Sequence, residues 1–336
     1  MIITGNCIDV MPQIEAESFH TCVTSPPYWG LRDYGLEPSY WPETTYTPML
    51  GLPPITVPEW TGCLGLEPTP EMFVSHMVLV FREVWRLLRP DGTAWVNFGD
   101  SYAGSGKGAW SNTDDQKEVY IPAPGGPQTK IPRLPSGLKP KDLVGIPWRV
   151  AFALQADGWH LRMDNIWNKT NPMPESVRDR PTKAHEYFFL LSKSECYYYD
   201  IESVMEQMAE SSLNRLAQGV EGQKGSERAN GGGKTNGMMK AVGNNSGSRN
   251  KRSVWTGSTA QFSEAHFAVF PEWLIEPCIM AGAPVGGRVL NPFGGSGTTL
   301  KVAMENNREC TIIEMGPHNV EIAERRTAVV QPTLIF

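Results

Sequence analysis

A glycine-rich segment near the C-terminus, NPFGGSGTT at residues 291–299, constrains the fold more than any other part of this chain. Residues 288–290 before it predict a strand, and a helix is expected from about Thr298. Residues 310–313 predict a second strand, which ends at Glu314. A glycine loop lets the backbone approach a ligand, and an acid about 20 positions later can accept hydrogen bonds from ribose hydroxyls. The segment therefore predicts a doubly wound α/β sheet with a ribose-containing ligand.

The same spacing leaves two other interpretations open. NAD binds to a similar unit, but the loop pattern typical of NAD sites is GxGxxG, which this segment lacks. The second alternative is a tight turn that only packs a helix on a strand. Because the loop, both strands and the acid agree with one another, a ligand site is favoured over such a turn.

A second informative segment, TSPPYW at residues 24–29, follows a short buried strand predicted over residues 21–24. Prolines cannot continue a central strand, so the strand must end at this motif. Open α/β sheets bind their ligands in loops at the carboxyl ends of the strands. The motif is therefore expected to form a functional loop, with a simple turn as the alternative.

These two segments, with the proline motif first and the glycine loop last, resemble the motifs of β-class DNA amino-methyltransferases. The similarity includes LRPDG at 88–92, NFGDSY at 97–102, IWNK at 166–169, RPTKAHEY at 180–187 and FPE at 270–272. It covers most of the chain outside residues 37–62, 103–140 and 200–252. The resemblance implies a Rossmann-like, seven-stranded methyltransferase sheet in permuted motif order, built by residues 1–199 and 253–336.

The resemblance also implies an activity, which is transfer of methyl from S-adenosylmethionine to an exocyclic amino group of a base flipped out of double-stranded DNA. The cofactor-binding motifs of the family match Asn6, Cys7, Pro271, Asn291, Phe293, Gly294, Gly295, Ser296, Gly297, Thr298 and Glu314. Asn6 and Asn291 stand where the family often has Asp. Asn keeps the hydrogen-bonding capacity of that position but lacks the negative charge that would attract a cationic donor.

The catalytic residues that the resemblance implies are Ser25, Pro26, Pro27 and Tyr28. An exocyclic amine of cytosine or adenine is a poor nucleophile, because its lone pair is delocalised into the ring. The Ser25 hydroxyl and a backbone carbonyl near Pro26 are suited to accept both N–H bonds as the nitrogen becomes tetrahedral. The prolines fix φ and so aim that carbonyl, and Tyr28 is expected to stack on the flipped base.

The target base is less strongly indicated than the reaction. In this family SPPY is commoner in cytosine-N4 enzymes and DPPY in adenine-N6 enzymes, so Ser25 favours cytosine-N4 and leaves adenine-N6 as the alternative. An RNA or another amine as substrate, and a catalytically inactive DNA-binding regulator, also remain open. Pro277-Cys278 matches the Pro-Cys pair of cytosine-C5 enzymes, but it lies in an apolar pattern typical of a helix and is not expected to be catalytic.

Two groups of basic residues are candidates for DNA contact. Arg180, Lys183 and His185 lie in a segment that the resemblance places near the target pocket, although as isolated residues they would be surface charges. The other group is Arg249, Lys251 and Arg252.

The second group belongs to residues 200–252, which are expected to form an inserted target-recognition region. Residues 211–252 carry a local charge of +6, whereas the whole chain carries −6. Their glycine and asparagine content predicts a segment that is mobile without DNA and ordered when DNA binds.

Bulk properties exclude several classes of protein. No stretch approaches the roughly 20 apolar residues of a membrane helix, and the N-terminus does not resemble a signal peptide. The six cysteines show no CxxC pair and no zinc spacing, so no metal is expected. The resemblance implies a cytoplasmic protein of a prokaryote or phage. It leaves open whether the protein forms a homodimer and whether a cognate restriction enzyme exists.

Local signals predict several further elements. Thr69 as N-cap, Pro70 at the first position and Glu71 in the first turn predict a helix that ends before the PDG segment at 90–92. Another helix is expected over residues 144–155, and strands over 93–98, 162–167 and 187–191. Residues 37–62 and 103–140 are expected to be loop insertions, the first of them ordered.

Overall fold

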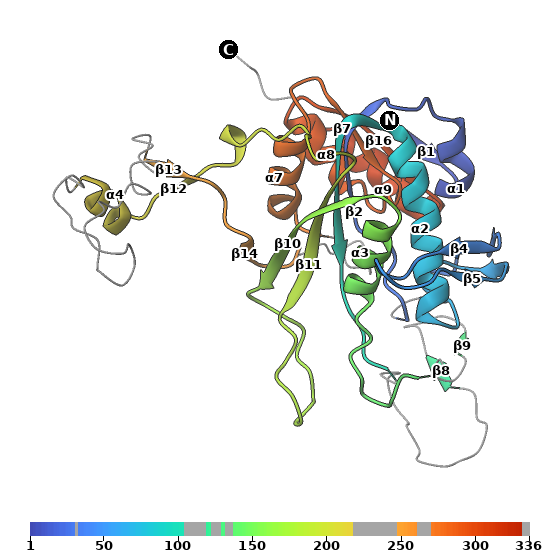
Figure 1. Cartoon of the computed structure of the whole chain (residues 1–336). Coiled ribbons are helices and arrows are strands. Elements are labelled where there is room, and N and C mark those ends of the chain that lie inside the picture. The colour runs from blue at the N-terminus through green and yellow to red at the C-terminus, as the bar shows by residue number, and fades with distance from the viewer. Residues whose placement is uncertain are drawn as a thin grey trace. The chain divides into compact units, whose positions relative to one another are not determined.

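The computed structural model describes residues 1–30, 33–103, 119–121, 129–131, 137–217, 247–260 and 270–330 (Figure 1). The chain divides into two compact units. One comprises Met1–Tyr199 together with Ser253–Phe336, and the other comprises Asp200–Arg252. The larger unit contains both the proline motif and the glycine loop.

An eight-stranded sheet forms the centre of the larger unit, in the order β1-β16-β15-β2-β7-β11-β10-β14. The strands are β1 Ile2–Thr4, β2 Phe19–Thr24, β7 Leu88–Phe98, β10 His160–Lys169, β11 His185–Ser192, β14 Val254–Gly257, β15 Arg288–Asn291 and β16 Glu309–Glu314. All neighbouring strands are parallel except at β11, which is antiparallel to β7 and to β10. The predicted α/β class is confirmed, and the sheet has one strand more than the seven predicted.

The helix predicted after Thr69 is α2, Pro70–Leu87. The Thr69 side chain accepts a hydrogen bond from the Met72 amide at 3.2 Å, and Pro70 occupies the first turn. Phe73 and Phe81, eight positions apart and so on one face of the helix, are completely buried. The other helices of this unit are α1 Cys7–Val10, α3 Ile146–Ala156, α7 Glu272–Gly282, α8 Thr298–Glu305 and α9 Pro317–Thr327.

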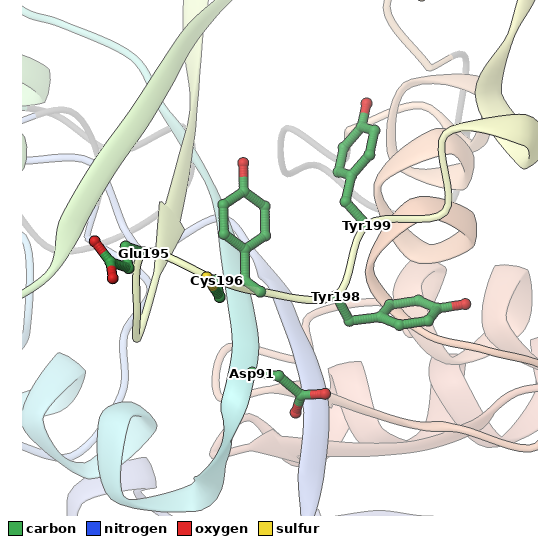
Figure 2. Close-up of a pocket in the computed structure, with 6 residues that line it drawn as sticks. Asp91, Glu195, Cys196, Tyr198 and Tyr199 are labelled. Atoms are coloured by element: carbon green, nitrogen blue, oxygen red, sulfur yellow. The ribbon is translucent and has the colours of Figure 1, made fainter.

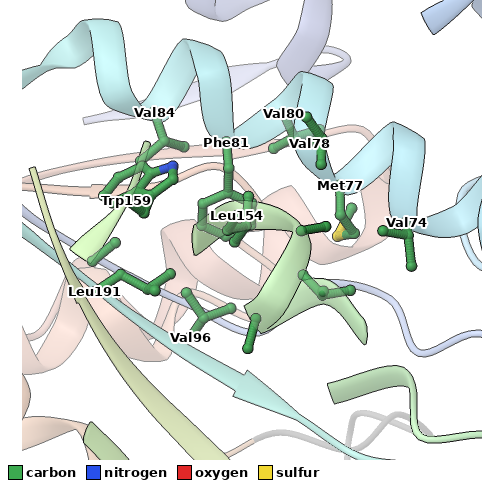
Figure 3. Packing of buried hydrophobic residues seen from close by; sticks show 14 of the residues in the cluster. Val74, Met77, Val78, Val80, Phe81, Val84, Val96, Leu154, Trp159 and Leu191 are labelled. Carbon is green, nitrogen blue, oxygen red and sulfur yellow. The ribbon is translucent and has the colours of Figure 1, made fainter. Parts of the chain in front are cut away.

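Helices cover both faces of the sheet, which explains why its strands are apolar on both sides. On one face, Val96 and Leu191 pack under α2 and α3 against Phe81, Leu154 and Trp159 (Figure 3). On the other face, α7 packs against β2 and β7 and also contacts α8. Gly282 in α7 lies so close to the sheet that a Cβ there would be 2.6 Å from the Thr21 hydroxyl oxygen.

The two regions predicted as loop insertions both contain short hairpins. In residues 37–62, β3 Ser39–Trp41 pairs with β6 Trp60–Gly62, and β4 Thr44–Tyr46 pairs with β5 Ile55–Val57. In residues 103–140, β8 Val119–Ile121 pairs with β9 Thr129–Ile131, where the sequence predicts only a loop.

The smaller unit is described for residues 200–217 and 247–252. It contains η2 Glu202–Val204, β12 Glu206–Gln207, α4 Glu210–Ala217 and β13 Ser248–Arg249, with β12 and β13 antiparallel. Residues 218–246, which make up most of the segment predicted to be mobile, lie outside the described residues.

None of the helices in the described ranges has the length and hydrophobicity of a transmembrane span. In the same ranges, His, Cys, Asp and Glu side chains form no group that could hold a metal ion.

The topology brings the predicted motifs to one edge of the sheet. Because β1, β2, β7, β15 and β16 are parallel, their carboxyl ends share that edge. Strand β10 also ends there, and the antiparallel β11 begins there. Segments far apart in the sequence therefore converge on a single site.

Candidate active site

The glycine loop between β15 and α8 has a conformation that requires its glycines. Gly295 and Gly297 have φ of +51° and +79°. A Cβ on Gly297 would lie 2.7 Å from the Ala323 Cβ, and one on Gly294 would lie 3.0 Å from the Ile312 Cβ. A side chain at these positions would therefore strain the backbone or push the loop away from α9 and β16.

Glu314 at the end of β16 binds this loop through its side chain. One carboxylate oxygen accepts from the Gly295 amide at 2.7 Å, and the other accepts from the Gly316 amide at 2.7 Å and the Asn319 side chain at 3.2 Å. A carboxylate has about four acceptor sites, so capacity for a ribose hydroxyl remains. A Cβ on Gly295 would meet nothing within 4 Å, so the space beside the loop is open. Both observations fit a nucleoside ligand.

Asn6 and Cys7 lie beside Glu314, because the Gly5 amide donates to the Glu314 carbonyl at 2.9 Å. The Asn6 side chain accepts from the Ile8 amide at 3.3 Å and so caps α1. Burial raises the pKa of the Cys7 thiol to about 12, so this thiol is neutral and packs as an apolar group.

Arg326 of α9 connects the glycine loop to α7 and was not predicted. Its guanidinium donates to the Ser296 carbonyl at 2.9 Å, the Ser296 hydroxyl at 2.8 Å and the Thr298 hydroxyl at 3.1 Å. It also donates to the Glu272 carboxylate at 3.1 Å, and Pro271 is the N-cap residue of the same helix. No local sequence pattern marks Arg326, which reaches the loop only through the packing of α9.

Asn291 joins the glycine loop to the strand that carries the proline motif. Its side-chain oxygen accepts from the Thr24 hydroxyl at 2.7 Å and from the Phe293 amide at 2.9 Å. Its side-chain nitrogen donates to the Thr299 hydroxyl at 2.9 Å. The residue is 1% exposed, so these contacts give both polar atoms of a buried amide a hydrogen-bond partner. Asn291 therefore acts as a link between the two motifs.

The proline motif leaves β2 and turns over the end of β7. The Ser25 hydroxyl lies 3.5 Å from the Asn97 side-chain oxygen, and the Tyr28 hydroxyl lies 2.9 Å from the same oxygen. Pro26 is buried and Pro27 is half-buried. A Cβ on Gly99 would lie 2.4 Å from the Tyr28 ring, so glycine is needed there.

Glu186 and Lys169 extend this cluster and were not assigned to the site from the sequence. The Tyr28 hydroxyl lies 2.8 Å from a Glu186 oxygen, and the other Glu186 oxygen forms an ion pair with Lys169. Burial and the neighbouring Glu186 carboxylate raise the pKa of Tyr28 well above its usual value, so the phenol stays protonated. Because a hydroxyl has one proton, Tyr28 can donate to either Asn97 or Glu186 at one time.

The segment that contains Arg180, Lys183 and His185 lies at the same edge. Arg180 pairs with Glu175 at 2.5 Å, and its guanidinium carbon lies 3.8 Å from the centroid of the Tyr102 ring. Burial lowers the pKa of Lys183, whose ammonium lies 4.0 Å from the Asp100 carboxylate. Burial and the Lys183 charge lower the pKa of His185. The charges of Arg180 and Lys183 are therefore partly compensated by carboxylates of the protein itself.

Asp100 is a further residue that sequence reasoning missed. One of its oxygens accepts from the amides of Ser101 at 2.9 Å, Gly145 at 3.0 Å and Ile146 at 3.1 Å. Asp100 therefore caps the N-terminus of α3 from a neighbouring loop, and it fixes α3 beside the carboxyl end of β7.

A pocket of about 640 Å³ lies elsewhere, lined by Asp91, Glu195, Cys196, Tyr197, Tyr198 and Tyr199 (Figure 2). Asp91 lies near the start of β7, before its pairing with β11 begins at Thr93, and residues 195–199 follow the end of β11. The pocket is therefore at the opposite edge of the sheet from Ser25 and is not the site described above.

Comparison with known proteins identifies the family. A family model described as DNA methylase matches residues 19–325. The chain belongs to the N6/N4 DNA methylase family. Type II methyltransferase M.SmaI of Serratia marcescens is 39% identical over 325 residues, which cover 97% of this chain and 89% of that protein. M.XycI of Xanthomonas campestris pv. cyanopsidis is 40% identical over 325 residues, which cover 97% of this chain and 86% of that protein.

Solved structures agree on the fold. The PvuII DNA methyltransferase, described as cytosine-N4-specific, has a TM-score of 0.58 at 17% identity. The match covers 97% of this chain and 85% of that chain. A DNA modification methylase of Thermus thermophilus, solved with S-adenosyl-L-methionine, has a TM-score of 0.51 at 20% identity, with 97% of this chain and 94% of that chain covered.

The family membership settles the class of activity. This DNA methylase is an S-adenosylmethionine-dependent amino-methyltransferase that acts on double-stranded DNA. The alternative of a catalytically inactive regulator is therefore set aside. Gly294, Gly295 and Gly297 with Glu314 are the residues that would hold the donor, and when bound the donor supplies an electrophilic sulfonium methyl group.

Proposed function

We propose that this DNA methylase modifies the N4 amino group of cytosine. The observation that carries the proposal is Ser25 at the first position of the proline motif, with its hydroxyl 3.5 Å from the Asn97 side-chain oxygen. A neutral hydroxyl therefore occupies the position where adenine-N6 enzymes of the family usually carry a carboxylate. Adenine-N6 is the alternative.

The proline motif offers two acceptors for the N–H bonds of the target amine. The Ser25 hydroxyl donates toward Asn97, which leaves its oxygen lone pairs free to accept from the target amine. The carbonyl near Pro26 accepts the second N–H, because the prolines hold it in place. These two acceptors oppose delocalisation of the nitrogen lone pair into the ring as the nitrogen becomes tetrahedral.

The identity of the modified nucleoside tests this proposal. DNA methylated by the purified enzyme is digested to nucleosides and analysed by mass spectrometry. We expect N4-methylcytosine and no N6-methyladenine. N6-methyladenine as the product would contradict the proposal and leave the family assignment intact. Duplex DNA is compared with RNA and protein in a parallel methyl-transfer assay, in which only DNA is expected to accept methyl.

We infer that residues 200–252 recognise the target sequence. Residues 211–252 carry a local charge of +6, and Arg249 and Lys251 within them both pair with Glu206, at 3.4 Å and 3.3 Å. Arg252 follows directly, and phosphate contacts are a natural use of this charge. Hydrogen exchange with and without a methylatable duplex is the test. We expect protection of the region only with DNA, and equal exchange in both states would contradict the role.

A cytoplasmic location, a homodimer and a cognate restriction enzyme stay predictions of the family resemblance. Sedimentation of the purified enzyme with and without DNA would decide the oligomeric state. A monomer in both conditions would contradict the dimer.

A further inference from the structure

A buried ionisable pair lies behind the proline motif, outside the residues discussed so far. Glu67 precedes α2, and His76 lies on the second turn of that helix. The His76 Nδ1 is 2.8 Å from a Glu67 oxygen, and the two side chains are 1% and 0% exposed. Burial raises the pKa of the Glu67 carboxyl. Burying such a pair carries a large desolvation cost, so its further contacts show which parts of the protein it supports.

The pair is connected to the proline motif through the short loop that contains Gly65. The second Glu67 oxygen accepts from the Gly65 amide at 2.8 Å. The Glu67 carbonyl accepts from the Trp29 indole N–H at 2.9 Å, and the Gly65 carbonyl accepts from the Gly30 amide at 2.8 Å. Two hydrogen bonds therefore hold the end of the motif, and the Glu67 carboxylate holds the loop that provides them.

Gly65 also touches the motif directly. Its φ is +94°, and a Cβ there would lie 3.1 Å from the Tyr28 carbonyl oxygen and 3.4 Å from the Pro27 Cβ. The loop thus packs against the backbone of the residues that follow Pro26. A small displacement of Gly65 would be transmitted to this backbone.

The other side of the pair is held by the inserted hairpins. The His76 ring stacks on Trp41 of β3, with centroids 4.3 Å apart and planes at 22°. It also stacks against Trp60 of β6, at 5.7 Å and 16°. The insertion therefore fixes the orientation of the imidazole, which in turn fixes Glu67.

We propose that Glu67 and His76 are positioning residues for methyl transfer. They connect the inserted hairpins and α2 to the Gly65 loop, and this loop sets the place of Pro27, Tyr28 and Trp29. The proposal rests on the catalytic role of Ser25 to Tyr28. It gives residues 37–67 a function in catalysis, since they support the acceptors that receive the target amine.

The test is a single-turnover measurement of methyl transfer by enzyme saturated with duplex DNA and donor. Glu67→Ala removes both side-chain contacts. We expect the rate of methyl transfer to fall about 10- to 100-fold, because a small misplacement of reacting groups slows a reaction by this order. Donor affinity by calorimetry should be unchanged, because the glycine loop is supported by other residues. Glu67→Gln can accept from Gly65 and donate to His76, so it should transfer close to the parental rate.

Two further variants separate positioning from loss of stability. Val84→Ala removes a completely buried side chain of α2 away from the Gly65 loop, and it should lower the melting temperature without slowing transfer. Trp29→Phe keeps the buried pair and removes the indole donor, so it should slow transfer even if Glu67→Ala does not fold.

Three results would overturn the proposal. The first is a parental rate for both Glu67→Ala and Trp29→Phe. The second is a Glu67→Gln variant as slow as Glu67→Ala, and the third is a loss of rate in Val84→Ala as large as that in Glu67→Ala. Ser25→Ala separates this failure from failure of the catalytic assignment. If Ser25→Ala is inactive while Glu67→Ala and Trp29→Phe are normal, only the positioning role is wrong. If Ser25→Ala transfers normally, the catalytic assignment itself is wrong.

Discussion

The glycine loop and the proline motif leave parallel strands at the same edge of one sheet, but they are held in different ways. The glycine loop is held mainly by its own backbone and by residues of the adjoining β16 and α9. Gly295 and Gly297 adopt positive φ, and Glu314 accepts from the Gly295 amide. The proline motif is held by side chains that come from distant segments, including Asn97 and Glu186.

We propose that this difference separates two functions, donor binding at the glycine loop and target binding at the proline motif. A donor site built from a local β–loop–α–β unit can bind the same cofactor in many proteins of one fold. A target site assembled from distant side chains can change with the substrate without disturbing donor binding. The two sites are therefore expected to respond independently to substitution, except where Asn291 joins them.

The largest expected effect is on the target side. Ser25→Ala should reduce the rate of methyl transfer about 10²–10³-fold, because it removes an acceptor that acts in the transition state. Donor affinity should stay close to the parental value. Single-turnover kinetics and titration calorimetry measure the two quantities, and methylation at the parental rate would show that the assigned chemistry is wrong.

A smaller effect is expected on the donor side. Glu314→Ala removes a carboxylate whose charge-assisted hydrogen bonds are worth about 1.5–3 kcal/mol, which corresponds to a roughly tenfold to hundredfold weaker donor affinity. DNA affinity should change much less. Calorimetry with S-adenosylmethionine is the measurement, and an unchanged dissociation constant would remove Glu314 from the site.

Asn291 contacts both motifs, so a substitution there is expected to affect donor affinity and transfer rate together. Asn291→Ala leaves the Thr24 hydroxyl and the Phe293 amide without their acceptor, at a cost of about 1–3 kcal/mol for each buried unsatisfied group. We expect a lower melting temperature and losses of about tenfold in both donor affinity and transfer rate. Asn291→Asp keeps the acceptor for Thr24 and Phe293 and adds the charge that the family often has there, so it should keep the link and lose neither donor affinity nor transfer rate. A loss confined to one site in the Ala variant would contradict the link.

The smallest effect concerns His185, whose pKa is lowered in the folded enzyme by burial and by Lys183. As the pH falls, the unfolded chain takes up a proton at His185 before the folded chain does, so acid reduces folding stability through this residue. Between pH 7.5 and 5.5 the parental enzyme should lose up to about 2 °C more in melting temperature than His185→Gln. Equal losses would show that His185 makes no contribution.

The sequence predicts the glycine loop much better than the surroundings of the proline motif, because the glycine loop depends on adjacent residues. The strand before the glycine loop, the start of α8 at Thr298 and the strand that ends at Glu314 follow from local pattern. Thr69 likewise predicts the start of α2, because capping depends on adjacent residues.

The parts that depend on distant contacts were not predicted. Arg326, Glu186 and Lys169 reach the site only through the packing of separate elements, and no local spacing marks them as neighbours. The NFGDSY, IWNK and RPTKAHEY segments indicated that these regions matter, but not which side chains meet. Residues 103–140 were expected to be a loop because their glycine and proline content conceals the β8–β9 hairpin.

The most direct test of the division between the two sites is a crossed measurement on Ser25→Ala and Glu314→Ala. Donor affinity and single-turnover transfer rate are measured for both variants over a range of S-adenosylmethionine concentrations. We predict that Ser25→Ala binds the donor normally and stays slow at saturation, whereas Glu314→Ala binds weakly and recovers most of its rate at saturation. Recovery of Ser25→Ala at high donor concentration, or a Glu314→Ala variant that remains slow at saturation with normal affinity, would contradict the account.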